Sequence, residues 1–183
     1  MCYLYGAMTL RVTLLICLLG LFSDLAAQEI LKPRPSPLAI AAVRYKDHYV
    51  KITYSQPQRK NRKIFGELVP FGKVWRTGAN EATELTTTRD IQINGQPLRA
   101  GTYSIFTIPE PDRWTIIINS DVGLWGAYNY NAAKDVYRFQ VPTQRADKTY
   151  DVFTIFFNNR NDVADLVIAW DNTLVTLPLK FTN

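Results

Sequence analysis

The chain has 183 residues and a mass of 20.9 kDa, which suits one ordinary domain and is too short for two large ones. Hydrophobic residues make up 47% of the sequence and charged residues 20%, so a packed core is available and a disordered chain is not expected. With only two cysteines and one histidine, the chain is a poor candidate for zinc fingers, iron–sulfur sites and hydrolases of the Ser–His–Asp type; its net charge is +5.

Residues 1–27 have the pattern of a secretory signal peptide. Arg11 precedes an apolar run from Val12 to Phe22, and small residues end the segment just before Gln28. The run is shorter than the roughly twenty residues that a helix needs to cross about 30 Å of hydrocarbon, which disfavours the alternative of a retained membrane anchor. We therefore expect removal of residues 1–27 and a periplasmic or extracellular location.

Cleavage at that point removes both cysteines, Cys2 and Cys17, so the mature chain must fold without disulfides. We expect no cofactor, no bound metal and no membrane span in the mature chain. Export and a modest net charge disfavour nucleic acid as a partner. A glycan, a peptide or another envelope protein remains as the expected partner, and the oligomeric state is left open.

An extended, proline-rich leader is expected over residues 28–37, because its prolines favour polyproline-like geometry. From Leu38 onward the apolar residues alternate and show no helical period. The run from His48 to Tyr54, for example, places Val50 and Ile52 on one face. This alternation is typical of half-buried strands.

Further short β-branched or aromatic runs predict strands at 102–108, 114–119, 136–141, 152–157, 163–170 and 174–181. Asn94-Gly95 is a strong hairpin signal, because both residues tolerate positive φ. Asp171-Asn172 is expected to form the turn between the last two runs. About nine strands at short spacing predict a single all-β domain over residues 38–183, either an antiparallel β-sandwich or a squat barrel.

Residues 55–80 interrupt this pattern as a long, basic loop. The segment contains six basic residues and one acid, Glu67. We expect its large apolar residues to anchor it to the core and to hold its cations toward one end of the sandwich; these residues are Ile64, Phe65, Leu68, Val69 and Phe71. Residues 64–68 are expected to form a single helical turn. A loop this long inside a compact domain is usually functional, or else a sign that its elements are wrongly assigned.

The basic loop also carries three strings that resemble a known family. They are Arg-Lys-Ile-Phe-Gly at 62–66, Leu-Val-Pro-Phe-Gly at 68–72 and Trp-Arg-Thr-Gly-Ala-Asn-Glu-Ala-Thr at 75–83. With further matches from Pro33 to Phe181, the chain resembles the domain of unknown function 2911 family of exported bacterial proteins. The resemblance implies export but no particular activity, cofactor or catalytic residue.

The candidate ligand-binding residues are Arg62, Trp75, Arg76, Asn80, Glu81, Trp125 and Tyr128. An aromatic face, a guanidinium, an amide and a carboxylate suit a neutral polar ligand such as a sugar or a short peptide. Trp125 and Tyr128 would add a second stacking surface if their loop meets the basic loop. The alternative is architectural: Trp75 fills the core, Arg76 and Glu81 form an ion pair, and Asn80 caps a turn.

These residues predict a binding or interaction module of the bacterial cell envelope, and a hydrolase acting on envelope carbohydrate or peptide is the alternative. A glycosidase needs two facing carboxylates, and Glu81 with Glu84 or with Glu67 is the available choice. If residues 82–88 form a strand, Glu81 and Glu84 should point to opposite faces. His48 has no second histidine at ligand spacing, so we expect it to be solvated.

Overall fold

Nine strands and one 3₁₀ turn make up the regular structure of residues 33–182, the part of the chain that this computed structural model describes. The expected signal peptide and residues 28–32 of the leader lie outside the described residues. The strands are β1 (Leu38–Tyr45), β2 (His48–Ser55), β3 (Thr83–Thr87), β4 (Ile91–Ile93), β5 (Gln96–Leu98), β6 (Gly101–Pro109), β7 (Arg113–Asn119), β8 (Asp135–Arg160) and β9 (Val163–Phe181), with η2 at Ala132–Lys134. No helix within residues 33–182 is long and apolar enough to cross a membrane.

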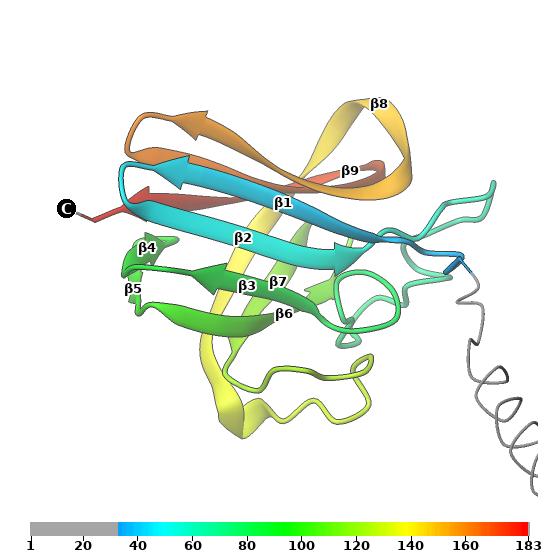
Figure 1. The fold of residues 1–183 in the computed structure, drawn as a ribbon. Coiled ribbons are helices and arrows are strands. Elements are labelled where there is room, and N and C mark those ends of the chain that lie inside the picture. The colour runs from blue at the N-terminus through cyan, green and yellow to red at the C-terminus, as the bar shows by residue number, and fades with distance from the viewer. Residues whose placement is uncertain (1–32, 183) are drawn as a thin grey trace, which may run out of the picture. The chain divides into compact units, whose positions relative to one another are not determined.

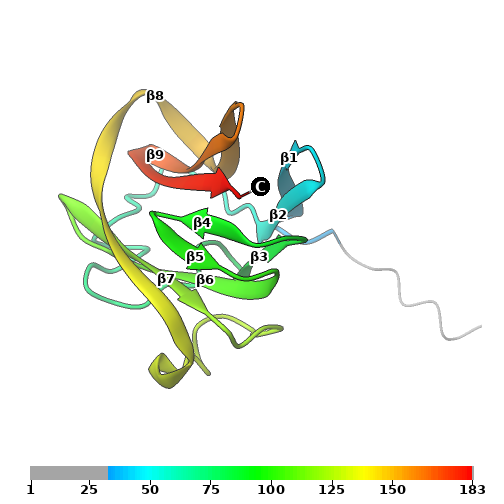
Figure 2. The ribbon, with the colours of Figure 1, turned by 90° about the vertical axis from the view of Figure 1, so that its left-hand side faces the viewer.

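All neighbouring strands pair antiparallel, in the order β1-β2-β3-β6-β7-β8-β9-β4-β5. The long strand β8 pairs with β7 up to Pro142 and with β9 from Thr143 onward, so it turns the corner between two halves of the sheet. Figures 1 and 2 show β8 sweeping around one side while β9 and β4 face the remaining strands. The sheet folds over on itself without closing, which confirms the predicted antiparallel, all-β class.

The predicted hairpin at Asn94-Gly95 is confirmed. Both residues have positive φ, 48° and 79°, and they connect β4 to β5. These are the angles of a type I′ turn, whose twist matches that of the two strands it joins.

The predicted turn at Asp171-Asn172 is wrong. β9 runs without a break through these residues, and Asp171, with a φ of 52°, pairs with Tyr150 where the β8–β9 register shifts. The chain reverses instead after Arg160, where Asn161 has a φ of 57°. The turn-forming Asp171 therefore produces an irregularity inside a strand, because the residues on both sides of it find partners along the same strand β8.

Alternating residues of β6 and β7 contribute to two different apolar clusters. Ile105 and Ile116 lie in the main core between the two halves of the sheet, whereas Phe106 and Ile117 point to the outer face. Loop residues cover that outer cluster, namely Val74, Leu124, Ala127 and Tyr130, together with Ala82 and Ile108. Two loops are thus fastened over one face of β6 and β7 by hydrophobic burial.

The expectation that His48 is solvated is also wrong. Only 8% of the residue is exposed, and its ring lies 5.7 Å from that of Phe181. His48 begins β2 on the inward side of the alternation that buries Val50 and Ile52. The strand pattern itself, and not the polarity of the imidazole, decides its position.

Candidate functional site

Trp75 is partly buried and packs against the main core, where other aromatic rings engage it. Its ring is 5.3 to 6.2 Å, centroid to centroid, from the rings of Phe65, Trp114, Phe153 and Trp170. Its indole Nε1 donates to the carbonyl oxygen of Gly78 at 3.0 Å. Its backbone pairs with Thr107 of β6, with N···O distances of 2.7 and 2.9 Å. Trp75 therefore fixes the basic loop to the sheet, as the architectural alternative expected.

Three of the five expected loop anchors are engaged with the core. Ile64 and Val69 are buried, and Phe65 packs against the main cluster. Leu68 and Phe71 are exposed by 42% and 38%, so the expectation was wrong for these two. The expected helical turn is a wider turn, closed by the hydrogen bond from Val69 N to Ile64 O at 2.9 Å.

The cations of the basic loop do not form one surface. Arg59 lies 3.6 Å from Asp151 and 3.2 Å from Asp171, and Lys63 lies 3.2 Å from Glu67. Arg62 donates to backbone oxygens of its own turn, Arg59 O at 3.0 Å and Gln58 O at 2.6 Å. Arg62 thus takes part in ordering its turn, and neither of these bonds reaches another candidate residue.

The exit of the basic loop and the loop at 122–130 meet side by side. Glu81 and Trp125 form an isolated antiparallel bridge. Ala82 N donates to Leu124 O at 2.8 Å, and Gly126 N donates to Asn80 O at 2.9 Å. These backbone bonds bring together two segments more than forty residues apart in the sequence.

Exposed aromatic side chains lie on the second of these loops. Trp125 is 56% exposed and Tyr128 is 81% exposed. Gly126 between them has a φ of 68°, and a Cβ placed there would lie 2.9 Å from the Tyr128 ring and 3.0 Å from Arg76 Nη1. The ring and the guanidinium therefore both lie against Gly126. We call Trp125, Tyr128 and Arg76 the aromatic platform.

Arg76 is half-buried and has no ion-pair partner recorded among residues 33–182, where its buried Nε also lacks a hydrogen-bond acceptor. The ion pair with Glu81 that the architectural alternative expected is not formed. Arg34 of the leader takes that place, with Nη1 at 2.6 and 2.9 Å from the two carboxylate oxygens of Glu81.

Partial burial of Glu81 opposes ionisation, but a backbone hydrogen bond and the Arg34 guanidinium outweigh it and lower the pKa of the carboxyl. Asn80 is likewise tied down, since its Nδ2 donates to Ser36 O at 3.1 Å and to Ser55 Oγ at 3.3 Å. Both residues therefore fasten the leader and the loops to each other.

Glu81 and Glu84 line one cavity of about 270 Å³, together with Leu38 and Gly123. The strand begins only at Thr83, so Glu81 precedes β3 and the alternation that was expected to send Glu81 and Glu84 to opposite faces does not extend to it. Glu84 Oε1 accepts a hydrogen bond from Gly123 N at 2.7 Å. Each carboxylate thus already has a partner: Arg34 for Glu81 and the Gly123 amide for Glu84.

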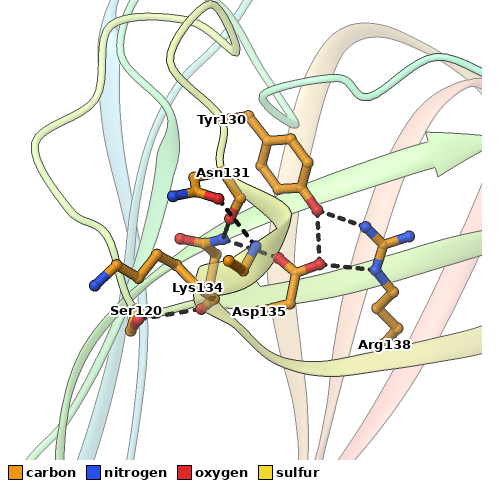
Figure 3. A network of polar contacts seen from close by, with 8 residues as sticks. Ser120, Tyr130, Asn131, Lys134, Asp135 and Arg138 are labelled. Atoms are coloured by element: carbon orange, nitrogen blue, oxygen red, sulfur yellow. Dashed lines mark hydrogen bonds and ion pairs between the residues drawn. The ribbon is translucent and has the colours of Figure 1, made fainter.

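A polar network holds the far end of the loop at 122–130, which we call the aromatic loop, as Figure 3 shows. Asp135 Oδ2 accepts from Tyr130 OH at 2.6 Å and from Arg138 Nε at 2.7 Å, while Arg138 Nη2 donates to Tyr130 OH at 2.6 Å. Burial and the Asp135 carboxylate raise the pKa of Tyr130 to about 12. Asn119 Nδ2 adds a bond to Asp135 Oδ1 at 2.8 Å. Sequence reasoning missed this cluster, whose residues are ordinary surface types at irregular spacing.

Within residues 33–182, no group of three or more His, Cys, Asp or Glu side chains is arranged to hold a metal ion. The two loops that meet present aromatic rings and a guanidinium to solvent. The two carboxylates beside them already have hydrogen-bond or ion-pair partners. Such a set can stack on an apolar face and donate hydrogen bonds.

Comparison with known proteins identifies a family. A family model described as "Protein of unknown function (DUF2911)" matches residues 36–179, which is most of the chain. No curated protein and no solved structure matches it. The matched region covers β1 to β8, most of β9, the basic loop and the loop of the aromatic platform. The chain belongs to the DUF2911 family.

Proposed function

We propose that this protein is an exported binding module that recognises a carbohydrate of the cell envelope on its aromatic platform. The observation that carries the proposal is the exposure of Trp125 and Tyr128, 56% and 81%, on one short loop beside the Arg76 guanidinium. Large aromatic side chains exposed together usually mark a surface that binds a partner. Their apolar faces suit the C–H faces of sugar rings, and a guanidinium donates to hydroxyl and ring oxygens.

The rigidity of the platform supports binding without a large ordering cost. The backbone bridge between Glu81 and Trp125 holds one end of the loop, and the network around Asp135 holds the other. Leu124 and Ala127 pack on the outer apolar cluster between these two ties. A preformed loop loses less conformational entropy when a ligand binds.

The hydrolase alternative has less support. A general acid needs a carboxyl that holds its proton near neutral pH, and the pKa of Glu81 is lowered instead. Glu84 is engaged by Gly123 N, and Glu67 lies on another part of the basic loop, paired with Lys63. Binding therefore accounts better for these groups than hydrolysis does.

A binding screen tests the proposal. The tag-free mature protein is incubated with immobilised neutral glycans, acidic glycans and short peptides, and retention is compared with that of Trp125→Ala and Tyr128→Ala. Tyr49→Ala is a matched control, since Tyr49 is a 40% exposed aromatic residue on β2 away from the platform. We expect retention on neutral glycans that both platform variants lose and the control keeps. Retention on peptides alone, or retention that neither platform variant reduces, would contradict it.

A further inference from the structure

The cavity that Glu81 and Glu84 line adjoins the aromatic platform. Its wall includes Gly123, which lies two residues before Trp125 on the same loop, and its volume is about 270 Å³. Complete small-molecule sites measure about 300–1,000 Å³, so this cavity suits one part of a larger ligand. A glycan that stacks on the platform can therefore place a further sugar ring in the cavity.

The side chains of Glu81 and Trp125 leave the backbone on the same face of their bridge. The two backbone hydrogen bonds of this bridge join the residues on either side of Glu81 to those on either side of Trp125, so the two residues form a non-hydrogen-bonded pair. In such a pair the Cα atoms lie about 4.5 Å apart and the side chains are neighbours. The Glu81 side chain is 40% exposed and Trp125 is 56% exposed. A ligand on the indole can thus extend to the carboxylate.

Both carboxylates can accept further hydrogen bonds. Arg34 contacts the two oxygens of Glu81 through a single nitrogen, Nη1. Glu84 Oε1 accepts from Gly123 N, and Oε2 has no partner recorded within residues 33–182. A carboxylate offers about four lone-pair sites on its two oxygens. The cavity therefore holds acceptors that are fixed in place and still available to a ligand.

The rest of the wall combines an apolar surface with hydroxyl-bearing side chains. Leu38 is 57% exposed at the start of β1, and Thr53 and Ser55 line the cavity from β2. Lys and Arg are absent from the described residues that form this wall. A sugar ring fits such a wall, since it has apolar C–H faces and hydroxyl donors at its edge. An acidic sugar would meet two carboxylates there and would be disfavoured.

We propose that this cavity is a second sugar subsite. One ring of the glycan stacks on the aromatic platform, and the next ring enters the cavity and donates hydroxyl hydrogen bonds to Glu81 and Glu84. The ligand is then a neutral oligosaccharide of at least two rings. The second subsite rests on the proposed function, because the first ring must stack on the platform for the next ring to reach the cavity.

Ligand chain length and charge test the subsite. Isothermal titration calorimetry measures the affinity of the tag-free mature protein for the mono-, di- and trisaccharide of the neutral glycan that the immobilised screen retains best. We expect the affinity to rise at least tenfold from the monosaccharide to the disaccharide, because the second ring adds hydrogen bonds in the cavity. The same disaccharide oxidised to a uronic acid should bind at least tenfold more weakly than the neutral form.

Glu84→Gln separates the cavity from the platform. The amide oxygen of this variant keeps an acceptor for Gly123 N, while its NH₂ group replaces the available acceptor Oε2. We expect at least a fivefold loss of affinity for the disaccharide, an unchanged affinity for the monosaccharide and an unchanged denaturation midpoint. Glu67→Gln is the matched control, because Glu67 is an exposed glutamate paired with Lys63 on the basic loop. It should bind both sugars like the parent protein.

The failure of the subsite and the failure of the proposed function give different results. The subsite is overturned by equal affinities for the mono- and disaccharide, by a disaccharide affinity that Glu84→Gln leaves unchanged, or by a uronic acid that binds as tightly as the neutral sugar. Binding on the platform stands in each of these cases if Trp125→Ala abolishes it. Sugar binding that Trp125→Ala does not weaken, or no binding of any sugar, would refute the proposed function and the subsite with it.

Discussion

Glu81 and Trp125 face each other across an isolated antiparallel bridge, and this pairing joins the exit of the basic loop to the loop that carries the exposed aromatics. Arg34 holds the side chain of Glu81 from the other side, at 2.6 Å. The leader, the basic loop and the aromatic loop are therefore linked through one residue. This linkage holds the loop that presents Trp125 and Tyr128 to solvent.

Replacing Trp75 should affect stability far more than replacing Trp125. Trp75→Ala removes the ring that contacts four other aromatic rings, and we expect a loss of about 3–5 kcal/mol in the free energy of unfolding. Trp125→Ala, at an exposed position, should change it by no more than about 0.5 kcal/mol. Chemical denaturation of the two variants measures the difference. Similar losses for both would mean that Trp125 is structural.

Arg76→Gln should leave the fold nearly as stable as the parent protein and weaken glycan binding at least tenfold. Arg76 has no ion pair within the described residues, so its removal leaves no buried charge unpaired. The denaturation midpoint and the glycan affinity are measured on the same preparation. A loss of about 2–5 kcal/mol in stability would instead identify Arg76 as an internal tie.

Arg34→Ala should have a small, pH-dependent effect. The Arg34–Glu81 pair is about half exposed, so we expect a loss below about 1 kcal/mol at pH 7. The pKa of Glu81 is lowered from its ordinary value of 4.5 in the folded state, so the stabilisation is present above 4.5 and is lost as the pH falls through the folded pKa. Urea denaturation at pH 7 and near pH 2.5 should show the two proteins converging in acid. A stability difference between the two proteins that widens in acid would contradict this assignment.

Tyr130→Phe should make the protein less sensitive to alkali. The pKa of Tyr130 is raised from 10.0 to about 12, so the folded state keeps a proton that the unfolded state loses. The stability that Tyr130 contributes is therefore present below pH 10 and is lost as the pH rises through about 12. Thermal denaturation between pH 9 and 12 should show a shallower decline for the variant than for the parent. An equally steep decline in stability for both proteins would show that the Tyr130–Asp135 hydrogen bond does not determine the response to alkali between pH 9 and 12.

The all-β class could be predicted, because the alternation of inward and outward residues along a strand is a local property of the sequence. Val50 and Ile52 are buried because every second residue of β2 faces inward, and the Asn94-Gly95 turn depends only on its own two φ angles. The corner in β8 could not be predicted, because it depends on which partner each half of the strand finds. The irregularity at Asp171 has the same origin, since a turn-forming dipeptide is overridden by pairing on both sides.

The candidate site was predictable only in part. The sequence pointed to Trp125 and Tyr128 and to the two loops, but Trp75 was equally compatible with a core and with a surface role. Its partners, Trp114 and Trp170 among them, come from strands distant in the sequence. Arg34 was missed as the partner of Glu81, because nothing in the leader indicates which carboxylate it reaches.

The most direct test of the central claim is isothermal titration calorimetry of the tag-free mature protein with the glycan that the screen retains best. The parent protein and the Tyr49→Ala control should bind with the same affinity, whereas the double variant Trp125→Ala/Tyr128→Ala should show at least a hundredfold loss with an unchanged denaturation midpoint. A double variant that binds that glycan as tightly as the parent protein would contradict the assignment of Trp125 and Tyr128 as the binding surface.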